Sequence, residues 1–260
     1  MEPGKAISAR LAALKASIAR IGRSENARSA AVLPFGISAI DARLPGGGLA
    51  VGALHEVAGG GTAVEHLAAA TLMIAGCLAR LSGAVLWALD QSDLFAPALD
   101  AVGLGPDRVI YAEAGKPKTA LLAMEEGLRH AGLAGVVGEV SGRLTLTASR
   151  RLQLAAEESG VTCFALRRPW NESNVLTEPI AAVTRWRVSA LPSPPPLSHS
   201  PDTTGLSRLR WRLELVRCRG GEPASWIVEA PDATGRLGLP ANLVNGSASA
   251  TPKRLRATAG

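Results

Sequence analysis

The sequence predicts an α/β protein: a doubly wound, mostly parallel sheet with flanking helices, an amino-terminal helix and a carboxy-terminal antiparallel part. The first observation is that short apolar runs alternate with helix-like segments between residues 53 and 167. Such regular alternation is typical of parallel βαβ units with right-handed crossovers. The second is a change after residue 181, where residues 207–219 alternate apolar and charged side chains and residues 225–229 can return antiparallel.

The amino-terminal region, residues 1–33, is predicted to hold an amphipathic helix and a polar linker. Residues 5–23 contain lysine and arginine but no acidic residue, which superficially resembles an organelle transit peptide. We favour a docking helix, because apolar residues recur at i+4, i+7, i+11 and i+14. These residues are Ile7, Leu11, Leu14, Ile18 and Ile21.

The core is expected to span residues 34–230. Apolar runs predict its parallel strands, and the longer segments between them predict its helices. We expect strands at 53–57, 84–89, 108–112, 135–140 and 161–167. We expect helices after the glycine-rich loop at Gly59 and near 97–102, 118–130 and 147–159.

The carboxy-terminal part is predicted to add antiparallel strands and a tail. Residues 182–190 form the first expected strand, and a proline-rich flexible loop at 192–205 follows it. After the strands at 207–219 and 225–229, residues 231–260 are rich in Gly, Ala, Ser and Pro. We expect a flexible basic tail that does not fold alone.

Composition restricts the class of protein. The 260 residues are 47% hydrophobic, which is enough to bury a sizeable core. A net charge of +6 is compatible with a nucleic acid or an acidic protein as partner. No apolar run is long enough to span a membrane, so we expect a cytoplasmic protein without a membrane partner. Cys77, Cys163 and Cys218 lie far apart without a C-x-x-C motif, and each is interpreted as a buried thiol.

The loop that begins at Gly59 has the frame of a phosphate-binding loop without its chemistry. An active loop reads G-x-x-x-x-G-K-[ST], in which backbone amides and Lys hold the phosphates and the hydroxyl holds Mg²⁺. Here Val64 stands at the second glycine position, Glu65 at the lysine position and His66 at the hydroxyl position. An ion pair at about 4 Å contributes roughly 4 kcal/mol at an effective dielectric near 20. Reversing the charge at residue 65 therefore disfavours a polyphosphate, and we expect no nucleotide cofactor and no metal.

The same residues fit a structural role. Thr62 to Glu65 has the S/T-x-x-E spacing of a capping box. We expect Thr62 to cap the following helix and the Glu65 side chain to return to the Thr62 amide. A carboxylate in the first turn also suits the helix dipole.

The run from Gly36 to Glu56, G-I-S-A-I-D-x-x-L-P-G-G-G-L-x-x-G-x-x-x-E, resembles the entry to the RecA core. The likeness continues through Asp90 to Pro97 and into the later strands, over about residues 5–240. Among RecA-like proteins, the chain resembles the ImuA family. That family consists of accessory proteins of inducible mutagenesis, found beside an inactive Y-family-polymerase-like protein and an error-prone C-family polymerase.

The resemblance implies that catalytic parts are missing. Ser92 stands where RecA has its water-activating glutamate, and Glu139 lies near the position of a Mg²⁺-associated aspartate without an upstream metal partner. We therefore expect a protein that is not an enzyme, with no catalytic residue. The chain between Arg167 and Ala182 is also short for RecA's second DNA-binding loop, which argues against a full recombination filament.

The function that the resemblance implies is a non-catalytic adaptor in the SOS response to DNA damage. It would link a Y-family-polymerase-like protein of the ImuB type and, indirectly, the C-family polymerase during translesion synthesis at the nucleoid. The amino-terminal helix would dock on RecA or on a second copy, or else pack on its own core. Two alternatives are a SulA-like cell-division inhibitor and a divergent ATP-dependent recombinase.

Candidate contacts with DNA or a partner fall into three groups. Arg167, Arg168 and Trp170 border the shortened loop, and the tail carries Lys253, Arg254 and Arg256. The third group, Arg208, Arg210 and Arg212, could follow a phosphate backbone, although the solvated face of an edge strand is the commoner cause of such a stripe. Arg217 has the opposite parity, so a continuous row would need a bulge. Trp186 and Trp211 are assigned to the core.

Overall fold

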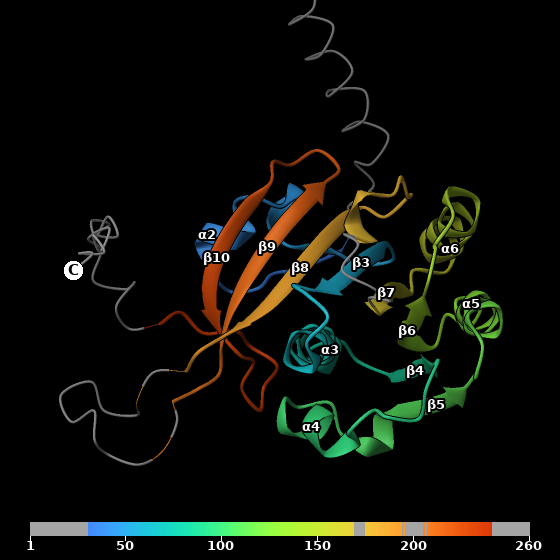
Figure 1. The fold of residues 1–260 in the computed structure, drawn as a ribbon. Coiled ribbons are helices and arrows are strands. Elements are labelled where there is room, and N and C mark those ends of the chain that lie inside the picture. The colour runs from blue at the N-terminus through green and yellow to red at the C-terminus, as the bar shows by residue number, and fades with distance from the viewer. Residues whose placement is uncertain (1–30, 169–174, 194, 196–204, 206, 241–260) are drawn as a thin grey trace, which may run out of the picture.

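The computed structural model describes residues 31–168, 175–193, 195, 205 and 207–240. Its centre is an eight-stranded sheet with the order β10-β9-β8-β3-β7-β6-β4-β5 (Figure 1). Neighbours from β8 to β5 pair in parallel, whereas β9 and β10 are antiparallel additions. The α/β class and its antiparallel extension are therefore confirmed. The strands are β3 (Leu54–Gly59), β4 (Ala84–Leu89), β5 (Val109–Glu113), β6 (Leu133–Ser141), β7 (Thr162–Arg168), β8 (Thr184–Leu191), β9 (Arg210–Cys218) and β10 (Ala224–Glu229).

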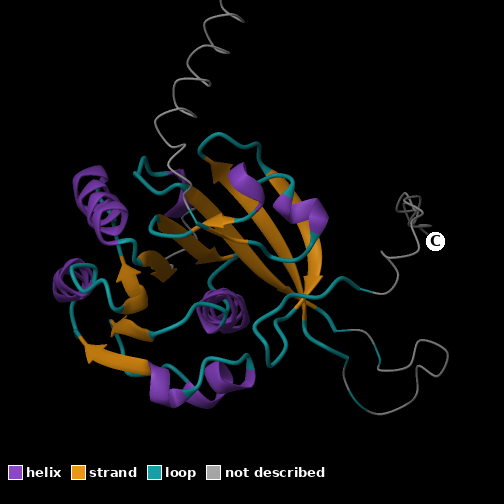
Figure 2. Cartoon of the chain, turned by 180° about the vertical axis from the view of Figure 1, so that it is seen from behind, coloured by secondary structure: helices purple, strands orange, loops and turns teal. Residues whose placement is uncertain are grey.

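Helices cover the two faces of this sheet unequally. The helices α2 (Ser38–Asp41), α3 (Val64–Ala79) and α4 (Ala96–Ala101) contribute to one buried cluster, which reaches from β5 to β10. The helices α5 (Pro117–Gly127) and α6 (Leu146–Ser159) cover the other face over β3, β4, β6 and β7. Figure 2, the view from behind, shows short helical segments in front of the strands on this side. The smaller elements are β1 (Val32–Leu33), η1 (Pro45–Gly47), β2 (Leu49–Ala50), η2 (Pro106–Arg108) and η3 (Val175–Thr177).

The core contains the residues that the sequence assigned to it. Trp186 and Trp211 are 0% and 2% exposed. All three cysteines are free and buried, and burial raises the pKa of Cys77 to about 12. Such a thiol stays protonated and unreactive at neutral pH.

The expected capping box is wrong. Helix α3 begins at Val64, its N-cap residue is Ala63, and no side chain caps it. Thr62 therefore lies one residue before the cap, and Glu65 is the second helical residue, whereas a capping box needs the third. The Glu65 carboxylate still lies in the first turn, where its negative charge interacts favourably with the helix dipole.

Residues 231–240, which the sequence assigned to the tail, lie against the core. Glu229 N–H donates to Gly238 O at 2.8 Å, which pairs this segment with the end of β10. Pro231 and Gly235 pack so closely on α3 that a Cβ on Gly76 would lie 2.8 Å from Pro231. Residues 241–260 and 1–30 lie outside the described residues, and so do the expected amino-terminal helix and the basic tail.

None of the helices in the described ranges is both long and apolar enough to cross a membrane.

His55 is a buried titratable group at the centre of the sheet. It is 0% exposed on β3, with Nε2 2.8 Å from the carbonyl of Ala50 and Nδ1 2.7 Å from the Thr184 hydroxyl. Because a carbonyl only accepts, Nε2 carries the proton. Thr184 Oγ1 already accepts from Trp186 Nε1 at 2.7 Å, so its hydroxyl proton is directed to Nδ1 of a neutral imidazole. Burial lowers the pKa of His55 to about 4, against the opposing effect of the bond to Ala50.

Acid should therefore destabilise the protein through His55. Between pH 6.5 and about 4 the unfolded chain binds a proton at residue 55 that the folded protein does not. The free energy of unfolding should fall by up to about 1.4 kcal/mol per pH unit in this window. The variant His55→Gln should show a smaller fall, measured by urea unfolding at about pH 7, 5.5 and 4.5. His130→Gln, at a residue with an exposed side chain, is the control, and equal slopes for wild type and His55→Gln would contradict the assignment.

Candidate functional site

The loop that begins at Gly59 connects β3 to α3 and packs directly on β8. Gly60 N–H donates to Val188 O at 2.9 Å. A Cβ on Gly60 would lie 1.8 Å from Ser189 Oγ, so only glycine fits there. The loop is thus held by the sheet, in the strand–loop–helix arrangement that the sequence predicted.

His66, at the hydroxyl position of the loop, binds the protein itself. Its Nδ1 accepts from the Ala190 amide at 3.0 Å, two residues beyond the last β3–β8 pair at Val188. Its ring also lies over the loop, since a Cβ on Gly61 would be 3.2 Å from His66 Cδ2. The imidazole therefore continues the attachment of α3 to β8 at the place where an active loop would bind Mg²⁺.

The other two diagnostic positions face solvent. Val64 is 77% exposed, and Glu65 is exposed in the first turn of α3. Where an active loop presents an ammonium group to phosphates, this loop presents a carboxylate beside an isopropyl group. Such a surface repels a polyphosphate.

An arginine occupies the carboxyl edge of the sheet beside the loop. Arg168 Nε donates to Glu139 Oε2 at 2.9 Å, and its Nη1 donates to Asp93 Oδ2 at 2.9 Å. Trp87 Nε1 donates to the other oxygen of Glu139 at 3.4 Å. Burial raises the pKa of Glu139, which Arg168 opposes, whereas the hydrogen bond from Arg168 lowers the pKa of Asp93.

This arrangement gives Glu139 a guanidinium partner in place of a metal ion. In the described part of the chain, no group of three His, Cys, Asp or Glu side chains is placed to hold a metal. Ser92, at the position expected for the water-activating glutamate, is exposed. A cavity of about 280 Å³ lies between this cluster and the start of α3, lined by Thr62, Val64, Leu67, Asp90, Gln91, Asp93, Ser141 and Arg168.

A second charged cluster lies inside the sheet. Glu56 on β3 is 0% exposed; Arg167 Nη1 on β7 donates to its Oε1 at 3.1 Å, and Arg185 Nε on β8 donates to its Oε2. Arg167 also lies 3.8 Å from Glu178 and donates to the Gly142 carbonyl. The sequence analysis used Glu56 only as part of a family pattern. The sequence signal for its role was the presence of three charged residues, Glu56, Arg167 and Arg185, in strands whose other residues are largely apolar.

These two clusters change the interpretation of two predicted contact residues. Arg167 is 1% exposed, so its side chain is not available to DNA or a partner. The Arg168 side chain is only partly exposed, and its guanidinium is bound by Asp93 and Glu139. Trp170, Lys253, Arg254 and Arg256 lie outside the described residues, as do Ile7, Leu11, Leu14, Ile18 and Ile21.

The stripe of Arg208, Arg210 and Arg212 is found at β9, but not on an edge strand. β9 lies between β8 and β10, so the explanation of the stripe as the outer face of an edge strand is wrong. Arg208 donates to the Ala230 carbonyl and lies 3.5 Å from Glu229. Arg210 and Arg212 project from β9 itself, and Arg212 is exposed.

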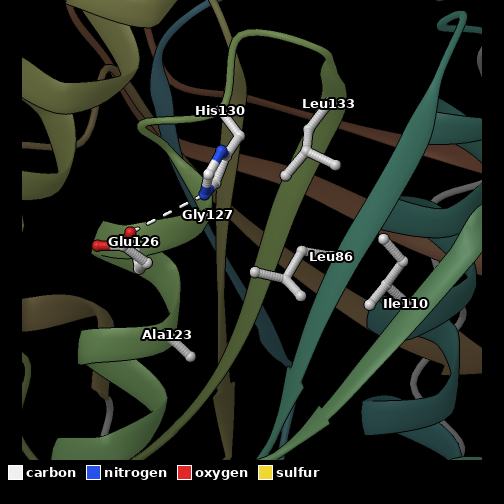
Figure 3. Close-up of a pocket in the computed structure, with 7 residues that line it drawn as sticks. All are labelled: Leu86, Ile110, Ala123, Glu126, Gly127, His130 and Leu133. Atoms are coloured by element: carbon white, nitrogen blue, oxygen red, sulfur yellow. Dashed lines mark ion pairs between the residues drawn. The ribbon is translucent and has the colours of Figure 1, made fainter.

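An apolar cavity of about 390 Å³ lies at the opposite edge of the sheet, between β4, β5 and α5. Figure 3 shows Leu86, Ile110 and Leu133 facing it, with Glu126 and His130 3.9 Å apart at its border. The lining offers no nucleophile and no cluster of cations. It suits an apolar side chain and not a phosphate.

Comparisons with known proteins agree with the fold. No family model matches the chain. Over 211 residues it is 41% identical to "Protein ImuA" of two strains of Caulobacter vibrioides, NA1000 / CB15N and ATCC 19089 / CIP 103742 / CB 15. The match covers 78% of this chain and 84% of each relative. The chain belongs to the ImuA family.

A solved structure, described as that of the RadB recombinase, shares the fold of this ImuA-family protein. The TM-score is 0.52 with 18% sequence identity, over 80% of this chain and 99% of the other. At this identity the likeness shows a common RecA-type architecture, and it says nothing about activity.

The Glu56 cluster should be a major determinant of stability. Glu56→Gln removes the charge that two buried arginines share, and breaking a buried ion pair typically costs about 3–5 kcal/mol. We expect a loss of that size in the free energy of unfolding, measured by urea denaturation. Glu222→Gln, which removes one partner of the exposed Arg43–Glu222 pair, should change it by less than about 0.5 kcal/mol. Equal effects of the two substitutions would contradict the role of the cluster.

Proposed function

We propose that this ImuA-family protein is a non-catalytic adaptor in DNA-damage-induced translesion synthesis. It acts in the cytoplasm, at the nucleoid when recruited. There it holds a Y-family-polymerase-like protein of the ImuB type and, through that protein, an error-prone C-family polymerase. These partners follow from the family resemblance.

The observation that carries the proposal is the use of the phosphate-loop edge by the protein's own side chains. Arg168 binds Glu139 and Asp93 where a metal and phosphates would be held, and His66 binds the amide of Ala190. A nucleotide would have to displace these contacts and approach Glu65 as well. A RecA-type domain with this edge supports a role as a rigid platform better than a role as a motor.

The segments proposed to bind partners lie at the two ends of the chain. Residues 241–260 carry Lys253, Arg254 and Arg256 and follow Pro240, the last described residue. We assign this segment to the Y-family-like partner, because a basic tail that orders on binding suits an accessory protein. Residues 1–30, with the apolar stripe from Ile7 to Ile21, are assigned to RecA or to a second copy.

Removing residues 241–260 should abolish partner binding without unfolding the core. A tagged protein ending at Pro240 keeps the pairing of Glu229 with Gly238, whereas a cut at residue 231 would remove it. In pull-downs from cells with damaged DNA, the full chain should recover the Y-family-like protein and the C-family polymerase, and the shortened chain should recover neither. The full-length variant Arg129→Gln/Arg150→Gln, changed at an exposed residue just after α5 and an exposed residue of α6, should behave as wild type.

A different set of partners would contradict the adaptor. Recovery of a cell-division protein without any polymerase would favour the inhibitor alternative. Undiminished recovery of both polymerases by the shortened chain would keep the adaptor but exclude the tail as its interface.

A further inference from the structure

One face of the sheet at β8, β9 and β10 carries no described helix. The helices on this side of the molecule pack on the opposite face, where Trp186, Trp211 and Val228 are buried (Figure 1). Successive side chains of a strand point to opposite faces. The bare face therefore receives the residues between those tryptophans and valines. They are Arg187 and Ser189 of β8, Arg210, Arg212 and Glu214 of β9, and Ser225, Ile227 and Glu229 of β10.

The register of the strands brings these side chains together. Arg212 lies opposite Ser189 on one side and Ile227 on the other. Arg187 lies opposite Glu214. Directly opposed residues of antiparallel strands have neighbouring side chains on one face, so arginines from two strands share one surface. We call Arg187, Arg210, Arg212 and Arg217 the arginine face.

A bulge adds Arg217 to this face. Trp186 pairs with Leu215, but the preceding Arg185 pairs with Arg217, so Val216 is an extra residue in β9. An extra residue reverses the parity of the strand beyond it. Cys218 consequently returns to the core at 7% exposure, and Arg217 is exposed on the side of Arg210 and Arg212. The bulge is the feature that a continuous row of arginines requires.

Two carboxylates lie beside the arginine face, and one of them, Glu229, is opposite Arg210 in the register but forms its ion pair with Arg208 at 3.5 Å. Glu214 lies 3.8 Å from Arg187. Within the described residues no ion pair is formed by Arg210, Arg212 or Arg217, and Nε of Arg210 is buried without a hydrogen-bond partner. Like charges that are close on a sheet destabilise it. An anion bound along the row would remove this repulsion.

We propose that the arginine face binds the sugar–phosphate backbone of single-stranded DNA. Residues two apart on a strand repeat about every 6.8 Å, and Arg210 to Arg217 span roughly 20 Å. This repeat is close to the spacing of successive phosphates along an extended single strand. The small side chains of Ser189 and Ser225 leave room for the strand, and Ile227, 40% exposed, offers an apolar contact to a base.

The proposal concerns the purified protein alone and goes beyond the adaptor function. An adaptor that fails to bind DNA would still recover its protein partners in a pull-down. A DNA-binding protein without those partners would still bind an oligonucleotide. The two ideas therefore fail separately.

The test is fluorescence anisotropy of the full-length protein with labelled oligothymidylate of about 30 nucleotides over a range of NaCl concentrations. For single strands, log K should fall against log salt with a slope of about −0.7 per phosphate contacted. Arg210→Gln/Arg212→Gln should weaken binding at least about tenfold and reduce the slope by about 1.4. Arg129→Gln/Arg150→Gln removes the same charge from the turn after α5 and from α6, and this variant should bind within about twofold of wild type. Thermal unfolding of each variant checks that it is folded.

A second variant separates binding from a structural role. Glu214→Gln removes the carboxylate beside Arg187 and should tighten DNA binding by several fold, which lost structure would not do. The proposal is overturned if the full chain does not bind, if the control pair loses as much affinity as the arginine-face pair, or if Glu214→Gln does not bind more tightly. It is also overturned if polyglutamate competes as well as DNA at equal charge, because the face would then bind an acidic protein equally well. Loss of all DNA binding by the chain that ends at Pro240 would overturn it too.

Discussion

The ion pairs of Glu56 hold the centre of this structure together. Its two oxygens bind arginines on the two strands that flank β3, so one carboxylate fixes β7 and β8 against the central strand. All three groups are buried, and a buried charge is tolerated only when it is paired. The phosphate loop continues from β3, Arg168 follows Arg167 on β7, and the antiparallel extension begins with β8. Each functional feature of the molecule therefore starts from a strand that this cluster positions.

The edge of the sheet beside the loop keeps the strand–loop–helix frame of a RecA-type fold. The strand, loop and helix remain, but contacts that a nucleotide would supply are made internally. His66 attaches α3 to β8, and Arg168 neutralises Glu139 at the end of β6. On the bare face of β8 to β10, Arg210, Arg212 and Arg217 form no ion pair within the described residues.

Much of the fold follows from the sequence alone, because buried parallel strands read as apolar runs between helical segments. β4 was predicted at its observed bounds, and the other parallel strands lie within a few residues of the prediction. The sequence could not place β9 inside the sheet, since strand order depends on tertiary pairing. The prediction of a capping box relied on the Thr62–Glu65 spacing alone. It failed because the helix begins one residue later than that spacing requires.

The candidate site was predicted less completely than the fold, because side-chain pairing also depends on tertiary structure. A sequence shows that Arg167 and Arg168 are charged, but not that Glu56, Glu139 and Asp93 come close enough to pair with them. Likewise, the parity of Arg217 indicated that a bulge was needed, and only the register of β8 with β9 located it at Val216. Residues 231–240 resemble a tail in composition, yet backbone bonds to β10 and contacts with α3 fix them.

The central claim is that a RecA-type platform binds its partner without using ATP. The most direct measurement is the affinity of the purified full-length protein for the purified Y-family-polymerase-like protein, by calorimetry, with and without ATP and Mg²⁺. The account predicts a stoichiometric complex with the same affinity in both conditions, and no heat from ATP added to the protein alone. A complex that forms only with ATP, or measurable binding of ATP that ADP competes away, would contradict it.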